Sequence, residues 1–290
     1  MSDNVSEILK KVLGVLGYDI YDAFIKVRLD TKRQRLEFKA EHEMYLKKQI
    51  LDDEKLTTQQ KIALNAVLGK NLMSFMREIS VLNIALDNIN DDANADNLNG
   101  DWLLDFFDKA SHITEKNTQL VWGKMLALAA SDKKICSKTL LNTLYLMSTE
   151  DITSFLNISR FVLTDRYINS NTKISSYPII FFSEYFQKYN IYQLSSFILN
   201  RLERLGLIET DYKSEYVFAE NEIELVYSNH VIKIVNADKI RIGNVRFTDD
   251  GYTLYLITNR MYDNSLLNEI IEIWIKRNYE VYVDGRLNTM

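Results

Sequence analysis

The chain has 290 residues, with 35 Lys and Arg against 40 Asp and Glu, which gives a formal net charge of −5. Hydrophobic residues make up 47% of it, enough to bury a sizeable core, so the composition excludes a disordered chain. The acidic balance excludes a general electrostatic attraction to nucleic acid or anionic lipid. Any such binding would need a local basic patch.

The cysteine count and the first residues bear on the compartment. Cys136 is the only cysteine, so no intrachain disulfide can form and a reducing compartment fits best. The apolar stretch within the first twenty residues is too short and too charged to span a membrane, and it has no small-residue cleavage site. We therefore expect a cytoplasmic protein without a signal peptide or membrane span.

Residues 1–90 predict an N-terminal helical hairpin or stalk. Pro178 is the only proline and glycines are few, which favours long helices. A first helix over Tyr18–Leu51 is mostly charged, and a second over Thr57–Asn88 has apolar residues at helical spacing. The second helix is apolar over more of its circumference than one neighbour would cover. We therefore expect self-association.

Residues 91–170 predict a compact central helical bundle. A run of Asn and Asp over residues 88–101 marks a linker, because these side chains bond nearby backbone in turns. Trp102 and Trp122 lie at helical spacing with other apolar residues and are expected in the core. Four polar residues are predicted to open the helices of the bundle, namely Asp101, Thr114, Ser137 and Ser148, the last with Asp151 as a capping box.

Residues 171–290 predict an α+β unit. Helices are expected over Phe181–Lys188 and Leu194–Leu205, followed by three stretches, YVFAE, IELVY and VIKIV, rich in branched and aromatic residues that favour strands. A helix over Leu266–Lys276 and a last strand over Tyr279–Val283 close the chain. The order is typical of a winged-helix-like unit, so the predicted fold class is mainly α with this α+β unit at the C-terminus.

The segment from Asp101 to Val162 resembles an uncharacterised bacterial domain-of-unknown-function family (2806 type), which is similar to the abortive-infection proteins called Abi-alpha. The later stretches LGLIE and FTDDGY look like the ending of that family, and the resemblance spans Met76 to Ile257. The matching positions are Asp101, Trp102, Phe106, Phe107, Gln119, Trp122, Ser137, Thr139, Leu140, Ser148, Glu150 and Asp151.

The resemblance implies an association with antiphage defence and brings no catalytic residues with it. Between Ala129 and Ser137 the chain departs from the family pattern, because AASDKKICS stands where members carry a Glu and a Pro-Gly turn. No role is therefore assigned to that Glu.

Arg35 and His42 are the candidate catalytic residues of an alternative, a helical ribonuclease. Seven residues apart on a helix, they return to nearly the same face, with His42 as acid or base and Arg35 as stabiliser of phosphate charge. The motif is short and arises easily in a charged helix. The histidines lack the spacings of a metal site and nucleotide-binding signatures are missing, so no metal and no cofactor is expected.

Asn200, Arg201 and Arg204 are the candidate nucleic-acid-binding residues of a second alternative, a winged-helix DNA-binding regulator. They lie on the helix that such a fold places in a DNA groove. Glutamates surround them, however, and the local charge is near neutral, whereas DNA-binding wings are usually basic. The sequence therefore favours a noncatalytic protein-interaction component over an enzyme.

Overall fold

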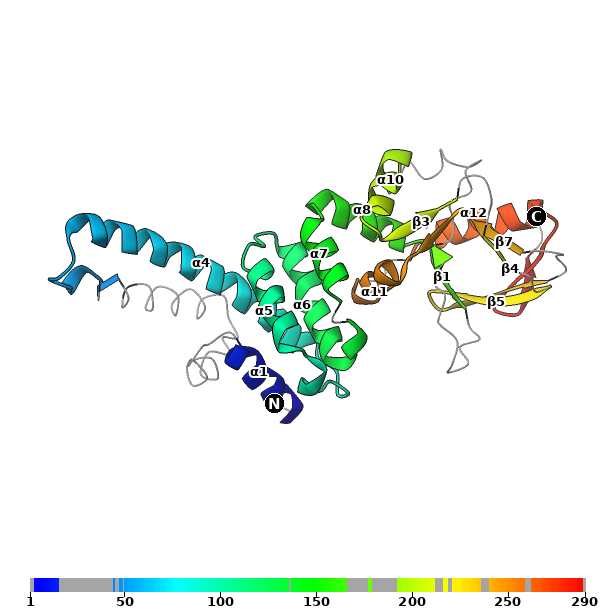
Figure 1. Cartoon of the computed structure of the whole chain (residues 1–290). Helices are drawn as coiled ribbons and strands as arrows, with labels where there is room; N and C mark the ends of the chain where they lie inside the picture. Colours follow the sequence, from blue (N-terminus) through cyan, green and yellow to red (C-terminus); the bar gives the residue numbers. More distant parts are fainter. Residues whose placement is uncertain are drawn as a thin grey trace. The chain divides into compact units, whose positions relative to one another are not determined.

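The computed structural model describes residues 3–15, 44, 47–48, 50–135, 137–165, 177–178, 192–211, 216–218, 221–235, 240–258 and 262–288 (Figure 1). The chain divides into two compact units, Met1–Leu141 and Asn142–Met290. The predicted helix over residues 181–188 and most of that over residues 18–51 lie outside the described residues.

The first unit is helical. Its described helices are α1 (Asp3–Val15), α4 (Thr58–Asn88), η1 (Ala95–Asn97), α5 (Gly100–Ala110), α6 (Lys116–Ser131) and η2 (Lys133–Ile135), and α7 (Lys138–Leu146) crosses into the second unit. The second half of α4 packs against α6. Gly123 of α6 allows this contact, because a Cβ there would lie 2.4 Å from Ile84 of α4. The helices therefore approach closely at this point.

The helix α4 has two different halves. A capping box of Thr57 and Gln60 fixes its start. Val81, Leu82 and Ala85 in its second half are buried, whereas the first half carries exposed apolar side chains. In Figure 1 this first half extends beyond α5 and α6, away from the other described helices of the unit.

The aromatic core of the first unit confirms the prediction for the two tryptophans. Trp102 and Trp122 are 2% and 0% exposed. Phe106 lies between them, with ring centroids 5.0 Å from Trp102 and 5.1 Å from Trp122. Aromatic contacts at such centroid distances stabilise a core beyond the area they bury.

Two predicted helix starts are wrong by one or two residues. The side chain of Asn99, not Asp101, accepts the N–H of Trp102 and caps α5. Asp101 lies inside the first turn, where its charge faces the positive end of the helix dipole. The helix α6 begins after Glu115, not Thr114, and no side chain caps it.

The predicted caps at Ser137 and Ser148 are confirmed. Ser137 Oγ accepts the N–H of Leu140 at 3.2 Å. Ser148 and Asp151 form the complete capping box of α8 (Thr149–Ser159).

The second unit adds antiparallel sheet to helix, which confirms a mostly helical chain with a C-terminal sheet. Its further helices are α10 (Ser196–Arg204), α11 (Asp249–Ile257) and α12 (Asn264–Lys276). One six-stranded sheet has the order β10-β9-β6-β5-β1-β2, and two further pairs are β3-β8 and β4-β7. The strands are β1 (Val162–Asp165), β2 (Tyr177–Pro178), β3 (Ile208–Thr210), β4 (Tyr216–Phe218), β5 (Glu222–Tyr227), β6 (His230–Val235), β7 (Ile240–Gly243), β8 (Val245–Phe247), β9 (Glu280–Val283) and β10 (Arg286–Asn288).

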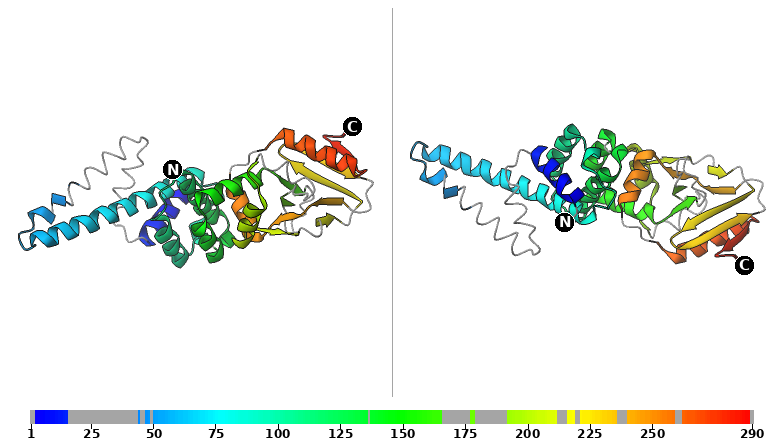
Figure 2. Two further views of the ribbon diagram at one scale, coloured as in Figure 1. Left: turned by 90° about the horizontal axis from the view of Figure 1, so that it is seen from above. Right: turned by 90° about the horizontal axis from the view of Figure 1, so that it is seen from below.

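The six-stranded sheet has a buried face and a more polar face. In β5 and β6 buried and partly exposed residues alternate, as the pleat of a strand requires. Ile223, Leu225, Ile232, Ile234 and Val281 lie on the buried face. The helix α12 packs along β9, as Figure 2 also shows.

The predicted strand over Tyr279–Val283 is present as β9 (Glu280–Val283), but the prediction that it is the last strand is wrong, because β10 follows it. Val283 pairs with Arg286, so Asp284 and Gly285 form a two-residue turn. Both have positive φ, 51° and 80°, as a type I′ hairpin turn requires. The Asp-Gly pair is the signal from which the hairpin could have been predicted.

Among the described residues, no helix combines the length and the apolar character that a membrane crossing requires.

Candidate functional site

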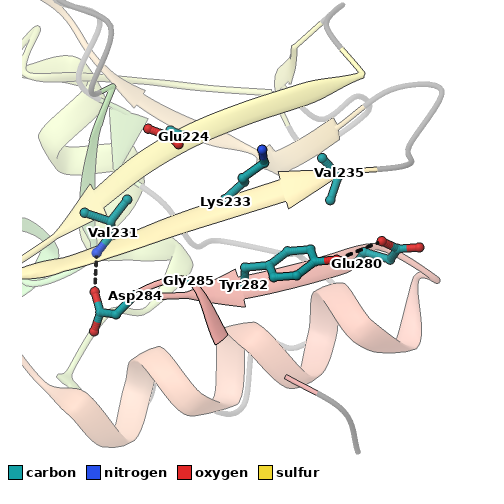
Figure 3. A pocket seen from close by; sticks show the side chains of 8 residues that line it. All are labelled: Glu224, Val231, Lys233, Val235, Glu280, Tyr282, Asp284 and Gly285. Carbon is teal, nitrogen blue, oxygen red and sulfur yellow. Dashed lines mark hydrogen bonds between the residues drawn. The ribbon is translucent and has the colours of Figure 1, made fainter. Parts of the chain in front are cut away.

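The polar face of the six-stranded sheet carries a hollow of about 620 Å³. Side chains from β5, β6 and β9 line it on one side of the sheet (Figure 3). The lining residues are Glu224, Val231, Lys233, Val235, Glu280, Tyr282, Asp284 and Gly285. They meet here because register, and not nearness in sequence, sets which side chains are neighbours across a sheet.

The register explains the layout of the hollow. Lys233 in the central strand β6 pairs with Glu224 of β5 on one side and with Tyr282 of β9 on the other. Val235 stands in the same way between Glu222 and Glu280. Two rows therefore cross the strands, each with charged groups beside an apolar or aromatic side chain.

Neighbouring side chains on this face form an ion pair and a hydrogen bond with one another. Lys233 Nζ lies 2.6 Å from Glu222 Oε1, and Tyr282 donates to Glu280 Oε2 at 3.3 Å. Three carboxylates and one ammonium line the hollow, so its balance is acidic. The groups lie side by side and do not converge on one point, which suits a contact surface better than a reaction centre.

Asp284 closes one end of the hollow. Its carboxylate accepts a hydrogen bond from the N–H of Val231 at 2.9 Å and lies 2.8 Å from His230 Nδ1. The bond with His230, followed by that from Val231, holds the pKa of Asp284 below its usual range. Asp284 therefore stays ionised and keeps the turn before β10 attached to β6.

The predicted nucleic-acid-binding residues lie on α10, but they are not equivalent. Asn200, Arg201 and Arg204 are all exposed. Arg201 also holds Asp151 of α8 with two hydrogen bonds, one from Nε to Oδ1 and one from Nη2 to Oδ2 at 2.7 Å. Phe197, on the same helix, is 72% exposed. The surface of α10 therefore combines one exposed apolar side chain with two exposed arginines, one of which is bonded to Asp151.

Asp151 is nearly buried, with a side chain 3% exposed. It accepts from both the N–H and the hydroxyl of Ser148 at 2.8 Å as well as from Arg201. Burial by itself would raise the pKa of Asp151, but the bonds from Arg201 and Ser148 outweigh it and lower the pKa below 3.8. Only the capping role could be predicted from the sequence, because Arg201 lies fifty residues away.

Two tyrosines surround Asp263 at the start of α12. The pKa of Tyr227 is raised to about 12, mainly because its hydroxyl is buried. The pKa of Tyr192 is also raised to about 12, first by burial and then by the neighbouring carboxylate of Asp263. Tyr227 accepts the N–H of Asp263 at 2.9 Å and donates to the carbonyl of Arg160 at 2.9 Å. Tyr192 donates to Asp263 Oδ2 at 2.8 Å. Both hydroxyls stay protonated at neutral pH and act as structural bonds.

The predicted catalytic pair, Arg35 and His42, lies outside the described residues. Within the described ranges, no three His, Cys, Asp or Glu side chains are grouped so that they could hold a metal ion.

The fold and the hollow together define a mostly helical protein with a C-terminal antiparallel sheet that presents a polar face. Residues 78–271 match the model of a family described as Protein of unknown function (DUF2806), and the chain belongs to this family. No curated protein and no solved structure matches the chain.

The contact between Asp151 and Arg201 predicts how stability depends on pH. Because folding lowers the pKa of Asp151 below 3.8, its contribution is present above that pH and is lost as the pH falls through the folded-state value. Asp151→Asn should lower the free energy of unfolding at pH 7 by about 1 to 3 kcal/mol. The variant should then lose less additional stability than the unchanged protein when the pH is lowered, because it lacks the carboxylate that titrates.

Denaturant unfolding at pH 7 and below pH 3.8 measures this difference. Glu209→Gln is the control, because it breaks an exposed ion pair with Arg246 that should contribute less than about 1 kcal/mol. Equal effects of the two variants would contradict the special role of Asp151.

Proposed function

We propose that the protein is a noncatalytic interaction protein whose sheet face binds a basic segment of another protein. The observation that carries the proposal is the hollow, with three carboxylates against one ammonium around Val231, Val235 and Tyr282. Lysine and arginine side chains suit such a surface, because their charged ends meet the carboxylates while their stems cover apolar groups.

The α10 surface supports a contact with protein rather than with DNA. A winged-helix-like arrangement is our proposal for this part of the unit, since α10 leads into β3 and β3 pairs with β8. In such an arrangement α10 would meet the ligand. Two N–H donors of Arg201 already bond Asp151, so fewer remain to bind a phosphate. The exposed Phe197 suits an apolar pocket of a partner protein.

A place in antiphage defence is the second part of the proposal. Its support is the resemblance in pattern, expected from the sequence, between this family and the abortive-infection proteins called Abi-alpha; the positions matched to the family pattern include Trp102, Gln119 and Trp122. In the structure Trp102 and Trp122 are core residues, and Gln119 bonds Ser80 at 3.0 Å and the carbonyl of Ile113 at 2.8 Å. These matched positions thus belong to the scaffold of the first unit, and the proposed role in defence rests on the resemblance alone.

The binding proposal predicts that an extended peptide alternating lysine with valine binds the full chain. Fluorescence anisotropy of the labelled peptide should show that Glu280→Gln weakens binding about three- to tenfold, because one rim charge is lost. Glu272→Gln removes the same charge from an exposed site on α12 and should leave binding unchanged. No binding, or an equal loss in both variants, would contradict the proposal.

The noncatalytic proposal predicts that the purified chain does not cleave RNA and does not shift duplex DNA. Gel shift at about 50 mM salt favours phosphate contacts most strongly and is the stringent condition. Cleavage that disappears in His42→Ala would establish the ribonuclease alternative. A salt-sensitive shift that disappears in Arg201→Ala with Arg204→Ala, while the variant remains folded, would establish the regulator.

The defence proposal predicts that expression of the chain in a phage-sensitive bacterium lowers the number of plaques. The core variant Trp122→Ala should remove this protection, since truncating a buried tryptophan costs about 3 to 5 kcal/mol. Leu104→Ala changes an exposed residue of α5 and should keep it. Plaque counts that stay equal with and without the chain across diverse phages would contradict this part of the proposal.

A further inference from the structure

The six-stranded sheet ends in two edges of different character. At one edge, β2 contains Pro178, which has no N–H to donate, and β2 packs beside β8. At the other edge β10 is the last strand in the order, so none of the described strands pairs with its outer side. Such an edge presents main-chain N–H and C=O groups to which a strand from another chain can bind.

The register of β10 shows which of its main-chain groups face outward. The N–H of Asp284, directly after β9, bonds the carbonyl of Val231 in β6 at 2.9 Å. Main-chain groups of successive residues point to opposite edges of a strand, so Val283 faces β10 and pairs there with Arg286. Leu287, the residue after Arg286, therefore directs its own N–H and C=O away from β9, toward the open edge.

The side chain of Leu287 lies on the same side of the sheet as the hollow. Leu287 pairs with Tyr282, and Tyr282 pairs with Lys233, so these three side chains stand in one row across the strands. Figure 3 shows Tyr282 and Glu280 on β9, within this hollow. Leu287 is 51% exposed. The open edge and the acidic hollow therefore adjoin each other.

We infer that an extended basic segment of the partner protein binds as a further strand beside β10, with main-chain hydrogen bonds to Leu287. The inference rests on the proposed function and adds the way in which the segment is held. Successive side chains of a strand point to opposite faces, so a segment that alternates lysine with valine directs all its lysines to one face. The main-chain bonds fix the register, and the lysines on the side of the hollow give the specificity.

The carboxylates beside β10 select a basic occupant. A strand next to β10 lies two strand spacings, about 10 Å, from β9. Its lysine side chains extend across β10 toward Glu280 at one end of β9 and Asp284 at the other, while their stems cover Leu287. Because β10 is short, it offers few main-chain bonds, so these charges contribute much of the affinity.

A second copy of the chain fits this edge less well. An antiparallel pairing of β10 with the same strand of another copy would place both hollows on one side of the joined sheet. Each hollow holds three carboxylates and one ammonium, so two acidic surfaces would then adjoin. Like charges brought together at a contact disfavour it. Charge thus selects a basic segment over a second copy.

Main-chain methylation of the peptide tests the inference on the unchanged protein. Fluorescence anisotropy compares two versions of the peptide that alternates lysine with valine, one N-methylated at neighbouring lysines and the other at neighbouring valines. Only one of these two sets of N–H groups faces β10, because alternate residues of a strand bond opposite edges. We expect that version to bind about tenfold more weakly and the other to bind like the unmethylated peptide.

Two variants at one position test the edge itself. Leu287→Pro removes the outward N–H and leaves the bonds between β9 and β10 in place, so it should weaken peptide binding about five- to tenfold. Leu287→Ala keeps this N–H and is the matched control, with an expected loss of less than about threefold. Circular dichroism during thermal unfolding checks that both variants remain folded.

The outcomes separate the inference from the proposed function. If the peptide binds and Glu280→Gln weakens it, but both methylated versions bind alike, the segment lies on the sheet face without joining the edge; the inference is then wrong and the proposed function stands. If the unmethylated peptide does not bind, both are wrong. Sedimentation velocity that shows a dimer of the unchanged chain, lost in Leu287→Pro, would overturn the inference by showing that a second copy occupies the edge.

Discussion

The helical part of the second unit depends on one buried carboxylate, that of Asp151. It closes the capping box of α8 with Ser148 and holds Arg201 of α10 through two hydrogen bonds. Asp151 is 3% exposed and Arg201 46%, so only the carboxylate is buried, and a buried acceptor that loses its partner destabilises the fold by about 1 to 3 kcal/mol. The contact therefore fixes α10 against α8. The strand β3, which pairs with β8, follows α10 directly in the chain and packs against it.

This constraint also bears on function. Arg201 is one of the three α10 residues that the sequence suggests for DNA binding, yet its guanidinium bonds the carboxylate of Asp151. The sheet face is different, because its charged side chains stand in rows set by strand register and remain half-buried or exposed. Such rows present charge and apolar surface together. They support our proposal of a surface that binds a partner and does no chemistry of its own.

Two glycines show how the first unit divides the surface of α4. Gly123 of α6 removes a side chain where the backbones come closest, so α6 covers the second half of α4. At Gly69, in the first half of α4, no atom of the described residues lies within 4 Å of where a Cβ would be.

Much of the secondary structure followed from local chemistry in the sequence. Helical spacing predicted α4 and the burial of Trp102 and Trp122, and the Ser148–Asp151 spacing predicted a capping box, because these features depend on residues within a few positions of one another. Asn99, not Asp101, caps α5, since Asn and Asp side chains both accept a backbone N–H two or three residues further on and the choice depends on where the helix begins. Only the tertiary structure decided the partner of Arg201 and the row of Glu224, Lys233 and Tyr282. These contacts join residues up to some fifty positions apart through packing and strand register, which no local pattern encodes.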